Sequence, residues 1–148
     1  MKGPFVVDAS ALLKLVVEEP GTQEARLFFS HLSDPNPISL YAPDLLYVEC
    51  ANTVLRYVTH YHYLPKQAQT ALSALSALPI QATATQLLFQ DALEIALHLR
   101  ISAYDACYLA LAEKLRCPLV TEDMDFIRKV RPHTKTPLHS LANLTPGG

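Results

Sequence analysis

Two carboxylates stand at the ends of short apolar segments that are typical of buried strands. Asp8 directly follows the segment 5–7, and Asp123 comes shortly after the segment 117–120. Moving a carboxylate out of water is costly unless a partner or a cation compensates it, so either position could belong to a functional site. Asp is also a favoured N-cap residue, and capping of the following helix explains each position equally well.

Two further acidic residues lie within predicted helices. Glu49, Asn52 and Arg56 form a polar stripe at helical spacing opposite a broad apolar face, a pattern that a plain solvated surface also produces. Asp105 is more informative, because its helix is apolar nearly all round and should be buried. A buried carboxylate needs a cation, a partner or water, although Ser102 and Asp105 also fit a capping box at a helix start.

The four carboxylates together indicate a site for a hard divalent cation. Strand ends and adjoining helices can converge on one cleft, and carboxylate oxygens are the ligands that Mg²⁺ and Mn²⁺ prefer. A zinc site is not indicated, because His60 and His62 have no cysteine near them in the sequence and are explained as surface histidines. We find no glycine-rich phosphate loop and no GxSxG motif, and Ser10 has no histidine base nearby in the sequence.

The elements that must position these residues alternate between short strands and helices. Hydrophobic spacing, prolines and turn residues predict strands at 5–7, 38–41, 80–84, 117–120 and 138–141. The same signals predict helices at 10–19, 22–32, 44–60, 67–75, 85–99, 102–116 and 126–130. This alternation predicts an α/β fold of three layers, with a short parallel central sheet between two layers of helices. Ligands in such folds gather beyond the carboxyl ends of the strands, where Asp8 and Asp123 are expected.

Length and composition favour one compact, reduced, intracellular domain. The 148 residues predict a single domain over 1–148, and half of them are hydrophobic. The three cysteines, Cys50, Cys107 and Cys117, are odd in number, form no CxxC pair and have apolar neighbours, so we expect small core thiols. No apolar run near the middle approaches the roughly 18 residues of a membrane span, and no room for a signal peptide precedes the first strand. We therefore expect a cytoplasmic protein without a membrane association.

Net charge gives little evidence for a nucleic-acid partner, but its distribution is more informative. The chain carries a formal charge of −2, and if four carboxylates form one metal site, the rest of the chain sums to +2. Four basic residues near the C-terminal end could meet a phosphate backbone, and they could equally be a solvated helix end: Arg128, Lys129, Arg131 and Lys135.

Taken in order, these motifs resemble a PIN domain, and more narrowly the VapC-type ribonuclease toxins of toxin–antitoxin pairs. The resemblance covers most of the chain, except for residues 61–84. It is carried by VVDASA at 6–11, Glu49 with Asn52, SAYDA at 102–106 leading into YLALA at 108–112, and LVTED at 119–123 with Phe126. Each motif is short, and their order and spacing make the set specific.

The resemblance implies a metal-dependent endoribonuclease that uses Mg²⁺ or Mn²⁺. Four positions fall on the family's acidic quartet, and three more fall on supporting polar positions: Asp8, Glu49, Asp105 and Asp123, supported by Ser10, Asn52 and Thr121. Asp125 is an additional acid that could substitute for Asp123 as the fourth member. The resemblance also implies an RNA substrate, a homodimer and a cognate antitoxin that inserts a segment near the active site.

Two other classes of function remain open at this point. One is a non-catalytic PIN-type module that binds RNA or protein, against which the complete quartet argues. The other is a different α/β phosphohydrolase with an acidic site. A haloacid-type phosphatase needs Asp-x-Asp after the first strand, whereas this chain has Asp8-Ala9-Ser10 there. In a phospho-receiver the modified acid ends a strand, whereas Asp105 falls within a helical pattern.

Overall fold

A computed structural model describes residues 1–145 and contains five parallel strands in one sheet. In sheet order these are β3 (Ile80–Thr83), β2 (Leu40–Pro43), β1 (Phe5–Val7), β4 (Leu119–Val120) and β5 (Leu138–His139). Val6 pairs with Tyr41 on one side and with Leu119 on the other, so β1 is the central strand. Because all five strands run in the same direction, their carboxyl ends meet at one edge of the sheet.

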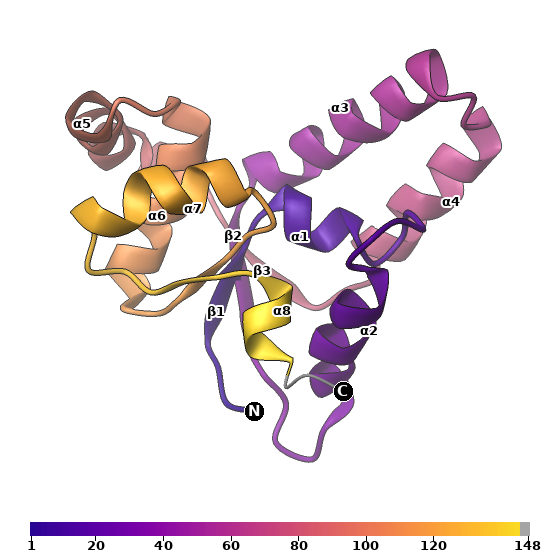
Figure 1. Cartoon of the computed structure of the whole chain (residues 1–148), viewed down its shortest axis with the longest axis horizontal. Coiled ribbons are helices and arrows are strands. Elements are labelled where there is room, and N and C mark those ends of the chain that lie inside the picture. Colours follow the sequence, from indigo (N-terminus) through magenta and orange to yellow (C-terminus); the bar gives the residue numbers. More distant parts are fainter. Residues whose placement is uncertain (146–148) are drawn as a thin grey trace.

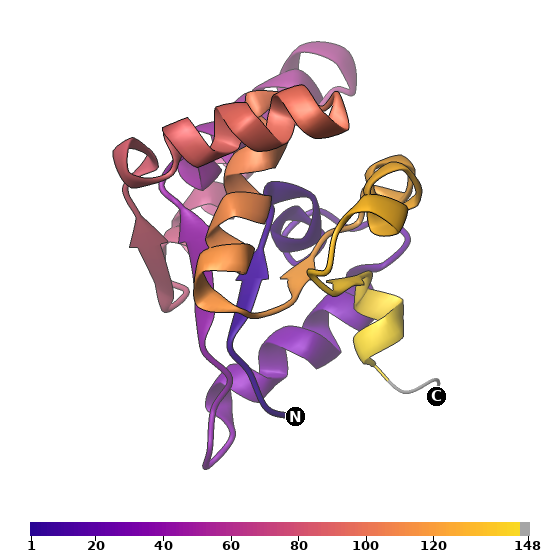
Figure 2. The same cartoon turned by 90° about the vertical axis from the view of Figure 1, so that its left-hand side faces the viewer.

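Helices cover both faces of this sheet, as predicted. They are α1 (Ala9–Leu13), α2 (Thr22–Ser30), α3 (Leu45–His60), α4 (Pro65–Ser76), α5 (Phe89–Leu99), α6 (Ala103–Leu115), α7 (Met124–Val130) and α8 (Leu141–Leu144). Single 3₁₀ turns occupy His31–Ser33, Thr85–Leu87 and Arg131–His133. Helix α6 packs on the sheet beneath α5, while α2 and α8 lie against the opposite face (Figure 1 and Figure 2). The predicted three-layer α/β/α fold is therefore confirmed.

The core forms where α6 meets the sheet. The β1 residues Val6 and Val7 are fully buried, and so are Leu109 on α6 and Val120 on β4. All residues from 106 to 112 are buried, which confirms the expectation drawn from the apolar pattern of this helix. The three cysteines are buried free thiols, also as expected. Burial of this much apolar surface fixes α6 in place and, with it, the side chains at its N-terminal end.

Helix α1 is shorter than the predicted helix 10–19. It ends at Leu13, and a compact loop leads on to α2. The loop is held by Thr22, whose hydroxyl donates to the carbonyls of Val17 and Glu19 and accepts from the Glu19 amide. Gly21 has a φ of +100°, a conformation that favours glycine, and Lys14 pairs with Glu19 across the loop. Contacts with α2 therefore override the local helical spacing.

The C-terminal end also differs from the prediction. Only residues 138–139 of the predicted edge strand 138–141 pair with the sheet, because Ser140 begins the short helix α8. The Ser140 hydroxyl accepts from the Asn143 amide, and the Asn143 side chain accepts from the Ser140 amide, which makes a capping box. Within the described part of the chain, no helix is long and apolar enough to cross a membrane.

Candidate active site

The acidic residues at the two strand ends do cap helices. Asp8 Oδ1 accepts from the Ala11 amide at the start of α1, and Asp123 Oδ1 accepts from the Phe126 amide at the start of α7. Because β1 and β4 are neighbours in the sheet, both caps lie at the same edge. Capping and a functional role are thus compatible: the cap fixes one oxygen of each carboxylate, and the second oxygen can take another ligand.

A small hydroxyl network connects these two strand ends. Ser10 Oγ donates a 2.6 Å hydrogen bond to Asp8 Oδ1 and accepts one from the Glu122 amide at 2.8 Å. It also lies 3.3 Å from Thr121 Oγ1, which accepts from the Asp123 amide. Thr121 is completely buried, so it lies behind the carboxylates rather than among them. The predicted supporting residues Ser10 and Thr121 therefore hold the loop after β4 against the loop after β1.

Glu49 reaches the same edge of the sheet from α3. Its Oε1 accepts a 2.6 Å hydrogen bond from the Tyr108 hydroxyl on α6, and Tyr108 itself is buried. This bond fixes one carboxylate oxygen in the same way that the helix caps do for Asp8 and Asp123. The Glu49 side chain is therefore fixed by this hydrogen bond and does not belong to a freely solvated helix face.

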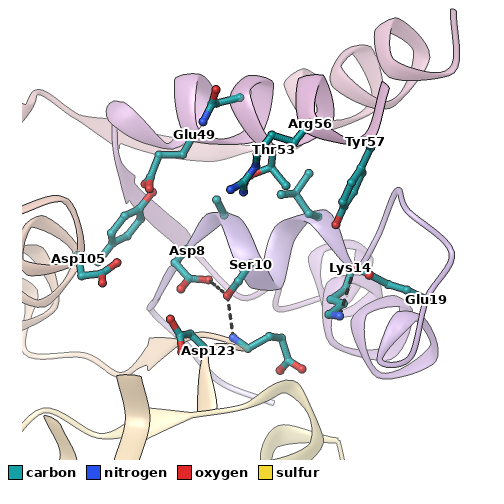
Figure 3. A pocket seen from close by; sticks show the side chains of 15 residues that line it. Asp8, Ser10, Lys14, Glu19, Glu49, Thr53, Arg56, Tyr57, Asp105 and Asp123 are labelled. Carbon is teal, nitrogen blue, oxygen red and sulfur yellow. Dashed lines mark hydrogen bonds and ion pairs between the residues drawn. The ribbon is translucent and has the colours of Figure 1, made fainter. Parts of the chain in front are cut away.

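Asp105 lies in the first turn of α6, where Ser102 is the N-cap. The Ser102 hydroxyl accepts from the Asp105 amide at 3.1 Å. Among residues 1–145, the Ser102 amide donates no hydrogen bond to the Asp105 carboxylate, so the reciprocal half of a capping box is missing. The cap accounts for the Asp105 backbone and leaves its half-buried carboxylate directed toward the other acids (Figure 3).

One cleft of about 600 Å³ brings the four predicted acids together. Its lining includes all of them and the predicted supporting residues Ser10 and Asn52: Asp8, Ser10, Glu49, Asn52, Asp105 and Asp123. Asn52 is exposed. Asp125 does not line the cleft and instead forms an exposed ion pair with Arg128. Of the two candidates for the fourth acid, Asp123 lines the cleft and Asp125 does not.

Burial raises the pKa values of three of the cleft acids, Asp8, Glu49 and Asp105. Burial raises the pKa of Asp8 to about 6 from 3.8, although its bonds to hydroxyls and to the Ala11 amide oppose the rise and nearby Asp105 adds to it. Burial likewise raises the pKa of Glu49 and of Asp105, and the charges of Asp105 and Asp123 respectively contribute to these shifts. No ion pair within residues 1–145 neutralises any of the four.

A set of carboxylates that form no ion pair with a protein cation in the described part of the chain fits a divalent metal ion in chemistry and in charge. Within residues 1–145, however, no three His, Cys, Asp or Glu side chains converge closely enough to hold a metal ion directly. Mg²⁺ commonly keeps several waters and binds proteins through one or two carboxylates, so this arrangement remains suitable for it. The remaining acids would then contact the ion through its water.

Several cleft residues were not selected from the sequence as site residues. They are Lys14, Glu19, Thr53, Arg56, Tyr57, Tyr108 and Glu122. Arg56 was visible as part of the polar stripe with Glu49 and Asn52, and Tyr108 lies one helical turn after Asp105. The spacing of Tyr108 gave a signal, but its partner on α3 could not be known without the packing of the two helices.

The basic residues near the C-terminal end are largely engaged in local contacts. Arg128 pairs with Asp125, Lys129 donates to the carbonyl of Arg100, and Arg131 donates to the carbonyl of Leu138. Lys135 lies before β5, at the amino end of the strands and away from the cleft. The cations that line the cleft with the four acids come instead from α3 and from the loop after α1: Arg56 and Lys14.

The fold and the cleft define an α/β domain with a cluster of acids at the carboxyl edge of its parallel sheet. Comparison with protein families matches residues 5–132 to the PIN domain, and the chain belongs to the PIN domain family. Ribonuclease VapC3 of Pyrobaculum aerophilum is 32% identical over 129 residues, which cover 84% of this chain and 93% of that protein. The family resemblance inferred from the motifs is therefore confirmed.

Two solved structures share the fold. VapC20 of Mycobacterium tuberculosis, described as a toxin that cleaves the sarcin-ricin loop, has a TM-score of 0.65 at 18% identity and covers 84% of this chain and 94% of its own. A toxin–antitoxin complex from Klebsiella pneumoniae has a TM-score of 0.62 at 16% identity, covering 93% of this chain and 98% of its own. At these identities the likeness concerns the arrangement of strands and helices.

Proposed function

We propose that this chain is a metal-dependent endoribonuclease that hydrolyses RNA phosphodiester bonds. The observation that carries the proposal is the meeting of four acids in one cleft, where none of them forms an ion pair within residues 1–145: Asp8, Glu49, Asp105 and Asp123. The name and extent of the VapC3 relative support a ribonuclease activity. A non-catalytic PIN module would have no need to keep four mutually repelling carboxylates at this edge.

The four acids would have different roles in binding the metal ion. Asp8 and Asp105 would be the principal ligands of Mg²⁺ or Mn²⁺, with Glu49 and Asp123 acting directly or through water. When bound, the ion would supply an activated water nucleophile and neutralise charge on the phosphate. Ser10 and Thr121 keep Asp8 and Asp123 at a fixed separation through the hydroxyl network. Asn52, an exposed amide in the same cleft, would orient water or a phosphate oxygen.

The experiment for this proposal measures cleavage of structured and single-stranded RNAs by the purified protein with Mg²⁺, with Mn²⁺ and with EDTA. We expect metal-dependent cleavage that is lost in Asp8→Asn and in Asp105→Asn and is retained in Asp125→Asn. Asp125 is the matched control because it lies two residues from Asp123 but outside the cleft. Full activity of the Asp8→Asn protein would refute the assignment. Metal binding without cleavage would favour the non-catalytic alternative, and hydrolysis of a chromogenic phosphate ester would favour a phosphatase.

We further propose that the protein is the toxin of a toxin–antitoxin pair. The VapC3 relative and the toxin–antitoxin complex of the same fold support this role. A groove of about 520 Å³, mostly apolar, lies along α4 and is lined by residues including Val16, Tyr63, Leu64 and Ala71. The adjoining pocket shares Glu19 and Tyr57 with the acidic cleft. An antitoxin segment in this groove would therefore lead toward the active site.

A homodimer is the second partnership that we propose. Phe89, Leu93 and Leu97 recur every four residues on α5 and are more than half exposed, so they form one apolar stripe. On α3, Val48 and Leu55 are 72% and 56% exposed. Exposed apolar side chains gathered in this way are typical of a surface that contacts another protein. A second copy of the chain would cover the stripe.

A further inference from the structure

Another pocket, of about 560 Å³, lies at the amino edge of the sheet, opposite the acidic cleft. Its walls are the C-terminal end of α6 with Cys117, which leads into β4, and the loop 133–137, which leads into β5. Because these segments precede two paired parallel strands, they lie at the edge where the strands begin. The acids lie where the strands end, and none of the described residues lines both pockets. This pocket is therefore separate from the candidate active site.

Three basic side chains line this pocket: Arg116, His133 and Lys135. They come from two segments that are distant in the sequence and that the pairing of β4 with β5 brings together. Within residues 1–145 none of these side chains forms a hydrogen bond or an ion pair, in contrast to Arg128 and Arg131. Basic groups that are gathered without a counter-charge repel one another, so binding of an anion among them is favoured.

The loop before β5 adds hydrogen-bond donors to these charges. Thr134 Oγ1 accepts from the Thr136 amide at 3.2 Å, which fixes the loop and leaves the hydroxyl hydrogen for a ligand. Thr136 also lines the pocket. The carboxylate in the lining is Glu113, and within the described residues it pairs with no base. The Arg116 amide already binds the carbonyls of Ala112 and Glu113 at the end of α6, so these acceptors are satisfied.

Arg116 has a backbone conformation that offers a clean test of its side chain. It ends α6 with a φ of +52°, in the left-handed region that glycine adopts without strain. Arg100 ends α5 in the same way, with a φ of +56°, and it does not line this pocket. Replacing either arginine with glycine therefore removes one charge and relieves the same strain, which gives a matched pair of variants.

We propose that this pocket binds a small phosphate monoester, such as a nucleoside monophosphate. A monoester carries about two negative charges and three terminal oxygens at neutral pH, which match several donors and bases, whereas a diester carries one charge. The planar guanidinium of Arg116 binds two of these oxygens, and Lys135 binds as a point charge. The Thr134 and Thr136 hydroxyls donate to the same phosphate.

The size and lining of the pocket indicate an organic group on the phosphate. Sites for small organic ligands commonly measure about 300–1,000 Å³, and this pocket falls in that range. Ala112, Cys117 and Pro137 contribute apolar surface beside the basic side chains. The inference stands apart from the ribonuclease proposal, because it uses no residue of the acidic cleft.

The experiment is a titration of the isotope-labelled full chain in metal-free buffer, followed by NMR. The probes are adenosine monophosphate, inorganic phosphate and adenosine, each at constant ionic strength. We expect adenosine monophosphate to shift the amides of Cys117 and of residues 134–136 saturably, while those of Asp8 and Asp123 stay unchanged. Inorganic phosphate should shift the same amides with lower affinity. Adenosine should not shift them, because the phosphate is the group that the bases recognise.

Variants then assign the binding to particular side chains. Arg116→Gly should weaken binding of adenosine monophosphate about tenfold, as the loss of charged hydrogen bonds predicts, and Arg100→Gly should leave it unchanged. Both glycine variants should melt at or above the wild-type temperature, so weaker binding in Arg116→Gly would not result from unfolding. Lys135→Gln should also weaken binding. Glu113→Gln removes the competing carboxylate and should strengthen binding about twofold.

Four results would overturn the inference. The first is the absence of saturable shifts in the pocket with adenosine monophosphate, and the second is shifts confined to the amides around the acids. The third is equal weakening in Arg100→Gly and Arg116→Gly, which would indicate an effect of net charge alone. The fourth is equal affinity for inorganic phosphate and adenosine monophosphate, which would indicate a site for the free ion. RNA cleavage is measured separately, so failure of this inference would leave the ribonuclease proposal standing.

Discussion

The Tyr108 hydroxyl donates a 2.6 Å hydrogen bond to Glu49 Oε1, which joins α6 to α3 across the wall of the cleft. Tyr108 is buried within the helix that packs on the sheet, whereas Glu49 faces the cleft from a helix with only three buried residues. The buried helix α6 therefore positions a carboxylate that belongs to the more exposed helix α3. Groups that hydrogen-bond to a metal ligand commonly determine how tightly a site binds its metal ion.

Removal of this bond should impair activity without unfolding the protein. Tyr108→Phe keeps the ring in the core and deletes the donor, and we expect RNA cleavage to fall about 10- to 100-fold. Because the bond lowers the pKa of Glu49, its loss should move the acidic limb of the pH–rate profile to higher pH. Tyr104→Phe, at an exposed position of the same helix, is the control and should retain full activity. An unaltered pH–rate profile in Tyr108→Phe would count against the positioning role.

The raised pKa of Asp8 predicts that neutralising this residue stabilises the metal-free fold. The pKa is about 6 in the folded chain against 3.8 in the reference state, so ionisation destabilises the fold as pH rises from 3.8 through 6. In EDTA, Asp8→Asn should match the wild-type melting temperature at pH 4 and exceed it at pH 8. The pKa shift limits the stabilisation by Asp8→Asn to about 3 kcal/mol. Solvent screening in the open cleft reduces the expected stabilisation to about 1–2 kcal/mol, which corresponds to a rise in melting temperature of about 2–6 °C.

Magnesium should reverse the order of these two proteins at pH 8. Metal that binds only the folded state raises the wild-type melting temperature, and Asp8→Asn should respond much less. Asn remains a good N-cap, so the variant tests the charge of Asp8 rather than the start of α1. Equal melting temperatures in EDTA at both pH values would show that the Asp8 carboxylate carries no burial penalty.

Glu122 should be important for stability through the C-terminal helix. Its Oε1 accepts a 2.6 Å hydrogen bond from the Leu141 amide at the start of α8, while its own amide donates to Ser10 Oγ. We expect Glu122→Ala to lower the free energy of unfolding in urea by about 1–2 kcal/mol. Glu122→Gln retains an acceptor and should lose less. Hydrogen exchange at the Leu141 amide should accelerate in Glu122→Ala; unchanged exchange there would contradict the proposed tether.

The apolar stripe on α5 should determine the oligomeric state. A double substitution, Leu93→Glu with Leu97→Glu, places two charges on side chains that are 56% and 72% exposed, so the fold itself should tolerate them. We expect light scattering to report a dimer for the wild type and a monomer for the variant. Glu94→Lys changes charge at a neighbouring exposed position and should leave the dimer intact. A wild-type monomer at every concentration would contradict the proposed dimer.

The fold could be predicted because its strongest signals are local. The burial of α6 follows from a helix that is apolar on every side, and the position of Asp8 follows from a strand that ends where a helix begins. The end of α1 could not be predicted, because Thr22 holds the following loop through contacts that the helical spacing of residues 14–19 does not report. Helix α8 was missed because four residues give too little periodicity.

The residues of the candidate site could be predicted from the sequence, but the hydrogen bonds that position them could not. Four acids and two supporting polar residues selected from the sequence do line one cleft. Which group holds each acid depends on packing between distant elements, as with Tyr108 and Glu49, and this is absent from any local pattern. The choice between Asp123 and Asp125 likewise needed the direction of α7, whose first turn turns Asp125 outward to Arg128.

Because β1 is the central strand and pairs with the distant strand β4, the cleft can form only late in folding. Val6 pairs with Leu119, and Asp8 shares its hydroxyl network with Thr121, so the first and last parts of the matched domain must meet before the acids do. Pairing between such distant segments forms late, because the intervening chain must be ordered first. During synthesis, Asp8 would emerge from the ribosome long before its partners on β4 and α7. A growing chain therefore carries an incomplete cleft until nearly all of the domain has been made.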